Sequence, residues 1–307
     1  MAPHPASSAR SEPPHSPGHV DAVRRFNRSY TQRVGVLEES FLGLGMPLGT
    51  ARLLYEIGVE PGTTRDLRTR LHLDSGYLSR LLRRLESDAL VSVEPDPDDR
   101  RRRRVDLTPA GRRAWDELER RSADRARDLV APLTDRQRAR LAAALSEADL
   151  LVRAATVRIE QVDPAGPAAL AAVAAYVAEL DERFPDGFEV GDLTAGTERL
   201  RSPDGAFVVA TSDGVPVACG GVQPIGDGAG EIKRMWVRPG WRGAGLGSRL
   251  LRHLEGVARD LGRTAVRLDT HGALTEAVEM YRRAGYREIE RYNDNPYAQH
   301  FFTKDLH

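Results

Sequence analysis

The chain has 307 residues, with 45 basic and 45 acidic side chains, so a formal net charge of zero gives no indication of a nucleic-acid or membrane partner. Its single cysteine, Cys219, excludes an internal disulfide framework and a cysteine-based metal site, and the eight histidines lack ligand spacing, so we expect no metal. The sequence contains neither an apolar run of about 18 residues nor a signal-peptide core, which predicts a soluble cytoplasmic protein.

Three segments follow one another along the chain. Residues 1–19 contain five prolines and little apolar content, and we expect a disordered tail there. Residues 20–155 are dominated by helical periodicity, with one short β-hairpin, which predicts a mainly α domain. Residues 156–307 alternate between strand and helix patterns, which predicts a separate α/β domain.

Two short helical patterns, over 64–71 and 74–89, stand in the middle of the first domain. Leucines recur at i, i+3, i+4 and i+7 from Leu78 to Leu85, which gives the second helix one apolar face. Its opposite face carries small polar residues followed by arginines, an order that suits a helix entering a DNA major groove. The residues on that face are Ser75, Tyr77, Ser79, Arg80, Arg83 and Arg84. A solvated amphipathic helix is the alternative.

A β-hairpin with a basic tip comes next. Short alternating strands at 90–93 and 104–107 flank a turn that runs into five consecutive arginines, residues 100–104. Arginines so close together repel one another, and contact with phosphates or a minor groove explains them better than a solvated surface does. Asp99 is placed to shape the tip by a bidentate pair with one arginine. The expected DNA contacts of the tip are Arg100, Arg101, Arg102 and Arg103.

Helix, turn, helix and basic hairpin together resemble the MarR family of winged helix-turn-helix regulators. The matching residues are Leu78-Ser79-Arg80, Leu85-Glu86, Leu90-Val91, Asp99-Arg100-Arg101 and the run from Val105 to Gly111. The resemblance covers residues 20–155 and implies binding to a pseudo-palindromic site on duplex DNA, with Arg101 or a neighbour in the minor groove. It also implies a homodimer joined through residues 20–42 and 110–155. Buried positions expected in those helices are Trp115, Leu118, Leu141, Leu145, Leu151 and Val152.

A glycine-rich turn is the main feature of the second domain. The pattern Arg242-x-x-Gly245-x-Gly247 opens an amphipathic helix, and uncovered N–H groups at a helix N-terminus bind phosphate. The spacing fits neither a Walker A loop nor a dinucleotide-binding fingerprint, and an ordinary glycine-rich turn is the alternative. Strands are expected at 157–162, 207–211, 215–222, 231–237, 265–270, 287–290 and 300–304, and helices at 168–182 and 274–284.

The strand Lys233-Arg234-Met235-Trp236-Val237, the glycine turn and the segment from Ala277 to Tyr286 together resemble the GNAT N-acetyltransferases. The resemblance implies a mixed, mostly antiparallel sheet flanked by helices over residues 156–307, and acetyl-CoA as the acetyl donor. His271 is the candidate substitute for an asparagine that the family often has where this chain has Leu274. The implied cofactor-binding residues are Met235, Trp236, Val237, Arg242, Gly243, Ala244, Gly245, Leu246, Gly247, His271, Leu274 and Tyr281.

Acetyl transfer to an amine requires the amine to lose a proton and the departing thiolate to gain one. Tyr281 is the candidate general acid, with packing against the cofactor as the alternative. Glu231 is the candidate base, acting through a water, with a solvated carboxylate at a strand end as the alternative. Backbone N–H groups of Met235 or Trp236 are candidates for polarising the thioester carbonyl.

The acceptor is expected to be a small or amino-acid-like amine, although surface packing explains most of the candidate residues equally well. These are Arg183, Phe184, Phe188, Lys233, Arg234, Asn293 and Tyr297. Three functions remain open: a bifunctional regulator and acetyltransferase, a regulator with a non-catalytic acetyl-CoA or amine sensor, or an acetyltransferase whose winged helix only dimerises. Because Lys233 and Lys304 are the only lysines, the first domain offers no lysine to acetylate.

Overall fold

The computed structural model describes residues 17–34, 39–71, 73–97, 99–184, 187–188, 196–212 and 214–306. The chain forms two compact units, Met1–Arg136 and Gln137–His307, and each is described by itself. Among the described residues, no helix is both long and apolar enough to cross a membrane.

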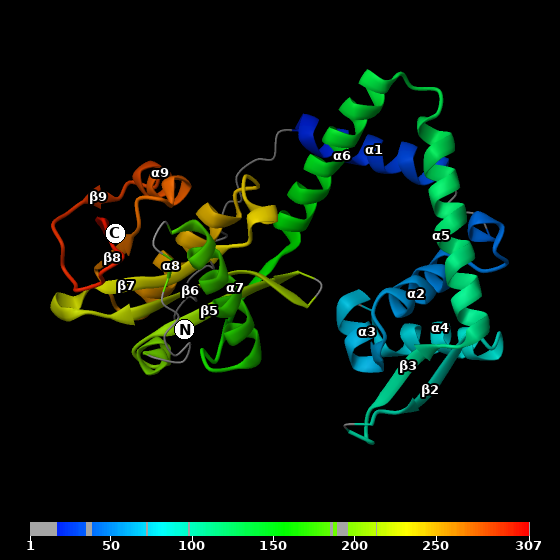
Figure 1. The fold of residues 1–307 in the computed structure, drawn as a ribbon, viewed down its shortest axis with the longest axis horizontal. Helices are drawn as coiled ribbons and strands as arrows, with labels where there is room; N and C mark the ends of the chain where they lie inside the picture. The colour runs from blue at the N-terminus through cyan, green and yellow to red at the C-terminus, as the bar shows by residue number, and fades with distance from the viewer. Residues whose placement is uncertain are drawn as a thin grey trace, which may run out of the picture. The chain divides into compact units, whose positions relative to one another are not determined.

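The first unit is mainly helical, with β2 and β3 beside each other below its helices (Figure 1), and its small antiparallel sheet has the order β1-β3-β2. Its helices are α1 (Pro17–Arg33), α2 (Leu48–Val59), α3 (Thr64–Leu71), α4 (Ser75–Ser87) and α5 (Pro109–Val130), with a 3-10 turn at Phe41–Gly43. Its strands are β1 (Gly62–Thr63), β2 (Val91–Pro95) and β3 (Arg103–Leu107). This is the winged helix arrangement that the sequence predicts, with α4 as the second helix of the pair and β2–β3 as the wing.

Local signals fix the elements of this unit. The Asp74 side chain accepts a hydrogen bond from the Tyr77 amide and caps α4, whose apolar face, including Leu78 and Leu85, is buried. The Thr108 side chain caps α5, and Pro109 occupies the first helical position, where its missing N–H has no cost. A Cβ on Gly111 would stand 1.8 Å from the Leu90 carbonyl oxygen, so only glycine allows α5 to start so close to the wing.

The second unit is a seven-stranded sheet in the order β4-β5-β6-β7-β8-β10-β9. Its strands are β4 (Arg158–Val162), β5 (Ala206–Ser212), β6 (Val215–Pro224), β7 (Gly230–Val237), β8 (Ala265–Thr270), β9 (Arg287–Glu288) and β10 (His300–Asp305). Its helices are α6 (Asp135–Thr156, starting just ahead of the unit), α7 (Pro167–Arg183), α8 (Leu246–Asp260) and α9 (Thr275–Arg283), with 3-10 turns at Thr197–Leu200, Gly226–Gly228 and Pro239–Trp241. All strand pairs are antiparallel except β7–β8, which confirms the mixed, mostly antiparallel sheet.

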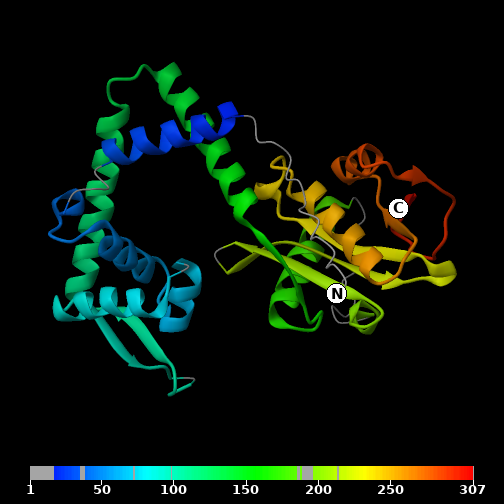
Figure 2. The ribbon, with the colours of Figure 1, turned by 180° about the vertical axis from the view of Figure 1, so that it is seen from behind.

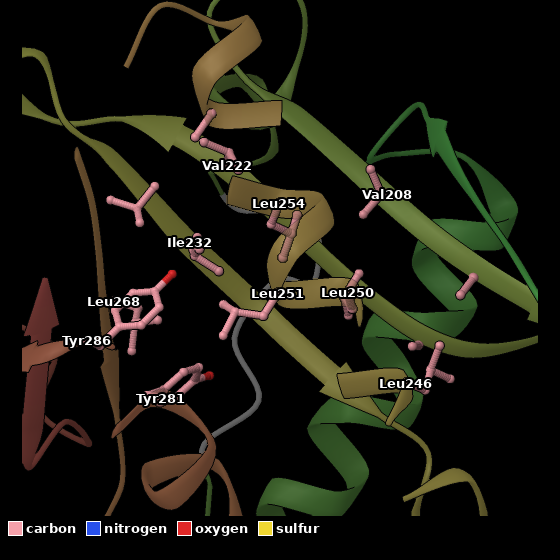
Figure 3. Packing of buried hydrophobic residues seen from close by; sticks show 14 of the residues in the cluster. Val208, Val222, Ile232, Leu246, Leu250, Leu251, Leu254, Leu268, Tyr281 and Tyr286 are labelled. Carbon is pink, nitrogen blue, oxygen red and sulfur yellow. The ribbon is translucent and has the colours of Figure 1, made fainter. Parts of the chain in front are cut away.

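Helices cover the two faces of this sheet, α7 on one and α8 on the other (Figures 1 and 2). The leucines of α8, among them Leu246 and Leu250, point onto the sheet, with Tyr281 and Tyr286 beside them (Figure 3). On the opposite face, α7 buries small residues against Cys219 and Trp236. Burial of these two apolar layers is the main source of stability of the unit.

The first helix differs in its bounds from the expected one, and several apolar side chains of α6 are exposed in the single chain. The helix expected over 20–42 begins at Pro17, inside the expected tail, and ends at Arg33, while residues 1–16 and 35–38 lie outside the described part. The burial expected for four α6 side chains is burial in the implied homodimer, and it stays a prediction. Leu141 is half-buried, and Leu145, Leu151 and Val152 are 39%, 46% and 61% exposed, because no described residue covers that side of α6. Trp115 is half-buried and Leu118 is buried.

Candidate functional site

The central strands of the second unit separate and open a cleft. β7 and β8 pair in parallel at only two positions, Gly230 with Val266 and Glu231 with Arg267. Further along β7, Arg234 has a left-handed φ of 52°, and the pairing with β6 shifts register between Cys219 and Gly221. Such a bulge increases local twist and redirects side chains. Two cavities lie where the strands have parted.

The first, which we call the loop cavity, has a volume of about 460 Å³. The glycine turn forms one wall, where Gly243 and Gly245 have left-handed φ values of 84° and 78° that favour glycine. Gly245 is the N-cap of α8, and the space where a Cβ would stand is open. Its lining includes Val237, Arg242, Gly243, Gly245, Gly247 and Glu276. An anion in this cavity would face the N-terminus of a fifteen-residue helix.

Two residues predicted for this wall do not line it. Ala244 packs against the hydrophobic core, and the Leu246 side chain is 1% exposed among the leucines of α8. Helical periodicity explains the difference, because Leu246 is the first residue of the apolar face of α8.

Glu179 of α7 holds several side chains of the loop cavity in place. Its carboxylate accepts hydrogen bonds from Trp236 Nε1 at 2.8 Å, from Arg183 at 3.3 Å and from Arg242. Arg242 also donates to the Val237 carbonyl oxygen at 3.0 Å. Burial raises the pKa of Glu179, but the hydrogen bonds from Arg242 and Trp236 outweigh it, and the pKa lies below its ordinary value. The sequence pattern of α7 contained no signal for this carboxylate.

The second, which we call the aromatic cavity, has a volume of about 390 Å³. Its lining includes Phe184, Phe188, Lys233, Asp269, His271 and Tyr297. The two cavities share a set of lining residues, so they meet. The shared residues are Tyr176, Leu180, Met235, Leu274, Ala277 and Tyr281.

Tyr281 of α9 stands where the cavities meet, and its side chain is 6% exposed. Its hydroxyl lies 3.9 Å from the Met235 sulfur. Burial, and secondarily the charge of Asp269, raises the pKa of Tyr281 well above its ordinary value. The phenol is therefore protonated throughout the neutral and mildly alkaline range.

Glu231 is not the solvated strand-end carboxylate that was one of the two expectations. Its side chain is 6% exposed and lines neither cavity. Gln223, Tyr292 and Asn293 donate to it at 2.6, 3.0 and 3.0 Å, and Lys233 Nζ lies 3.3 Å away. The burial follows from its position in the middle of the sheet, where Glu231 still pairs with β8.

Asp269 of β8 is the acidic residue of the aromatic cavity, and the sequence patterns did not single it out. Lys233 donates to it at 3.0 Å, and the side chains of Asn293 and Asn295 donate at 3.3 and 2.6 Å. The sequence predicts Lys233 as a residue of the acceptor site. In the structure it is paired with two carboxylates of the chain itself, Asp269 and Glu231.

The remaining predicted residues divide between the cavities. Arg183, predicted for the acceptor, lines the loop cavity instead and pairs with Glu276 at 2.8 Å, because it lies on the face of α7 that carries Glu179. Leu274 lines both cavities, whereas His271 lines only the aromatic one. Cys219 is fully buried, and burial raises the pKa of its thiol to about 12, so its role is in the core.

The predicted DNA-reading residues of the first unit lie on the exposed face of α4. Ser79 donates to the Ser75 carbonyl oxygen at 2.8 Å, and the Arg80 guanidinium lies 5.5 Å from the centre of the Tyr77 ring. Tyr77 also lies over the start of α2, since its hydroxyl is 2.6 Å from where a Cβ of Gly49 would stand. Arg83 donates to Ser79 O at 3.2 Å, and Arg84 remains exposed on the same helix.

The wing arginines differ in their contacts. Arg102 Nε lies 3.2 Å from Asp99 Oδ2, and Arg103 donates to the Val93 carbonyl oxygen at 2.6 Å. Arg100 and Arg101 are exposed, and within the described part of the chain their side chains have no hydrogen bond or ion pair. Among the described arginines of the wing tip, Arg100 and Arg101 are therefore the ones whose charges are available for contact with DNA.

Comparisons with known proteins agree with this arrangement. The model of the acetyltransferase (GNAT) family matches residues 173–286. An IAA acetyltransferase of Azospirillum brasilense is 34% identical over 118 residues, which cover 38% of this chain and 77% of that protein. An uncharacterized N-acetyltransferase of Schizosaccharomyces pombe is 36% identical over 107 residues, covering 34% of this chain and 66% of the relative.

The model of the MarR family matches residues 44–102, which include α2 to α4 and the wing. A crystal structure of a mutant MarR from E. coli complexed with operator DNA is 25% identical, with a TM-score of 0.36, and covers 43% of this chain and 95% of that one. The chain therefore belongs to the GNAT acetyltransferase family, a family that uses acyl-CoA donors, and carries a MarR family domain ahead of its acetyltransferase domain.

Proposed function

We propose that the protein is a bifunctional transcriptional regulator and acetyl-CoA-dependent N-acetyltransferase that acts on a small amine. The observation that carries the proposal is the junction of the two cavities at Tyr281. A donor held in the loop cavity and an amine held in the aromatic cavity would meet beside a buried phenol.

The residues present fit acetyl-CoA. The open space at Gly243 and Gly245 lets phosphate oxygens approach the backbone N–H groups at the start of α8, and Arg242 stands beside them. The strand from Met235 to Val237 lines the same cavity and offers backbone groups to an extended amide chain. When bound, acetyl-CoA supplies the activated acetyl group.

Chain residues then have three roles. Arg242 and the turn amides bind the phosphates, with Glu179 orienting Arg242. The backbone N–H of Met235 or Trp236 would polarise the thioester carbonyl of the donor in the transition state. Tyr281, whose raised pKa keeps it protonated, donates its proton to the departing thiolate.

The MarR family domain supports the DNA-binding half of the proposal. The exposed face of α4 reads a major groove, and Arg100 and Arg101 meet phosphates or the minor groove. We infer a homodimer on a pseudo-palindromic site. Its basis is the exposed apolar side chains of α1, such as Val23 and Phe26 at 67% and 51%, together with those of α6.

The decisive experiment measures thiol release from acetyl-CoA with a panel of amines, alongside acetyl-CoA binding by calorimetry and retardation of the protein's own upstream DNA. Thiol release and salt-dependent retardation are both expected. Tight acetyl-CoA binding without release for any amine would instead support the sensor. Release without DNA binding would leave the winged helix as a dimerisation module.

A further inference from the structure

We propose that the acceptor is an amine carried on a flat aromatic group, and that Asp269 is the catalytic carboxylate that holds its ammonium and takes up its proton. The inference rests on the proposed acetyl transfer and deepens it by naming the acceptor class and a residue that contacts it.

Aromatic rings from separate segments line one wall of the aromatic cavity. Phe184 follows α7 and stacks on His271, which follows β8, with ring centres 4.1 Å apart. Tyr297, from the loop before β10, lies 5.9 Å from Phe184 and 4.8 Å from Phe188. Aromatic pairs favour these spacings, and a wall of such rings recognises another ring or the cation beside it.

Access to the cavity distinguishes the two buried carboxylates of the cleft. Glu231 accepts hydrogen bonds from Gln223, Tyr292 and Asn293, and Lys233 is its ion-pair partner at 3.3 Å. Asp269 also accepts three hydrogen bonds, from Lys233, Asn293 and Asn295. An ionised carboxylate has about four acceptor sites, and Asp269 lines the cavity, so its remaining site is placed to meet an ammonium or a water. Glu231 lines neither cavity and does not face the acceptor.

The charges around Asp269 balance, because two carboxylates, Glu231 and Asp269, face two cations, Lys233 and Arg234. Lys233 lies between the carboxylates, at 3.3 and 3.0 Å, so direct contact with Asp269 is what would hold an ammonium. Arg234 also lines the cavity, and its charge acts on Tyr176 of α7 and on the Cys219 thiol. An acceptor with a carboxylate next to its amine would place that carboxylate toward Arg234.

His271 is a donor rather than the base. Its Nδ1 accepts a hydrogen bond from the Ala273 amide at 3.0 Å, so in the neutral ring the proton is on Nε2. Among the described residues lining the cavity, Asp269 is then the only carboxylate that can accept a proton from the amine.

The reaction balances with these groups. The ammonium gives one proton to Asp269, which passes it to solvent, and the free amine attacks the thioester carbonyl. A C–N bond forms and the C–S bond breaks, and the thiolate takes the Tyr281 proton. The second proton leaving nitrogen restores Tyr281. Ammonium and acetyl-CoA thus yield amide, free thiol and one proton.

Binding of four probes to the full chain, measured by calorimetry without acetyl-CoA, tests the proposal. The probes are 2-phenylethylamine, phenylalanine, hexylamine and 3-phenylpropionate. We expect the aromatic amine to bind about tenfold or more tightly than hexylamine and 3-phenylpropionate. A comparable affinity of phenylalanine would identify amino acids as acceptors, with Arg234 as the partner. Equal affinity for hexylamine, or stronger binding of 3-phenylpropionate, would overturn the proposal.

Variants test the residues separately. Asp269→Asn should weaken aromatic-amine binding about tenfold and displace the pH profile of kcat, and Tyr297→Leu should weaken binding without displacing that profile. Asp294→Asn is the matched control. Asp294 lies in the loop before β10, as Tyr297 does, but its side chain does not line the cavity. An unchanged affinity and pH profile in folded Asp269→Asn would refute its role. Thiol release that is equal for all amines would leave acetyl transfer standing and remove this inference. Absence of release with intact aromatic-amine binding would remove acetyl transfer and the catalytic role of Asp269, and would leave only an aromatic-amine binding site.

Discussion

The Arg153 guanidinium lies 4.8 Å from the centre of the Trp241 ring, which links the last turn of α6 to the turn that precedes Arg242. Arg249 of α8 donates to the carbonyl oxygens of Ala154 and Val157 at 2.9 and 2.7 Å. These carbonyls lie at the end of α6, where the helix itself supplies no donors, so Arg249 caps them. The end of α6 is thereby part of the support of the glycine turn.

A fragment of residues 157–307 should therefore be less stable than one of residues 137–307. It lacks the buried Ala154 and the ion-assisted hydrogen bond from Arg249, together about 2 kcal/mol, or ~4–8 °C in Tm for a unit of this size. Thermal unfolding followed by circular dichroism measures the difference. Equal Tm values for the two fragments would show that α6 contributes nothing to the unit.

Gly245→Val should weaken acetyl-CoA binding by at least about tenfold, because a β-branched residue is strained at a φ of 78° and its side chain would fill the approach to the amides. Gly240→Val is the control, since the space at Gly240 is also open and its φ is ordinary. Calorimetry on both folded variants provides the comparison, and unchanged affinity in Gly245→Val would reject the loop assignment.

Tyr281→Phe removes one hydroxyl and should lower kcat by about 10²–10⁴-fold, with little change in acetyl-CoA affinity. Tyr286→Phe is a close control, because that hydroxyl is buried without a hydrogen-bond partner among the described residues and its ring lies 5.8 Å from Tyr281. Since the pKa of Tyr281 is raised above its ordinary value of 10, kcat should show no alkaline loss from this group below about pH 10. Wild-type turnover in Tyr281→Phe would reduce the residue to packing.

Replacing Arg100 and Arg101 by glutamine should weaken binding to all duplexes. In the proposed homodimer four arginines are lost, so the slope of log affinity against log salt should fall by about 4, because each arginine neutralises one phosphate. Arg252→Gln with Arg259→Gln changes the net charge equally on exposed positions of α8 and should leave DNA binding unchanged. Titrations of labelled DNA at several salt concentrations measure the slope. An identical effect in both double variants would mean that overall charge, not the wing, is responsible.

Neither lysine of the chain should be acetylated by the enzyme itself. Lys233 is paired with Asp269 at 3.0 Å, and Lys304 with Glu255 at 2.9 Å. Peptide mass mapping after incubation with acetyl-CoA should find both unmodified. Stoichiometric acetylation of either lysine would contradict this, and an accompanying change in DNA affinity would indicate self-regulation.

Periodicity and short motifs predicted the elements well where local signals are strong. The helices expected over 64–71 and 74–89, the two hairpin strands that follow and the helix opened by the glycine turn lie close to their predicted places. Asp269 and Glu179 could not be found this way, since their roles arise when β7 and β8 separate and α7 packs beside them. The exposure of Leu151 and Val152 has the same origin, because an apolar pattern does not specify what covers it.

The single cysteine has a practical consequence. Because the Cys219 thiol is fully buried and burial raises its pKa to about 12, it should not react with thiol reagents while the chain is folded. A colorimetric assay for liberated coenzyme A would then carry no background from the protein. A cysteine introduced on the exposed face of α4 would be the one accessible thiol among the described residues, so a fluorophore could be attached there to follow DNA binding while the native cysteine stays in place.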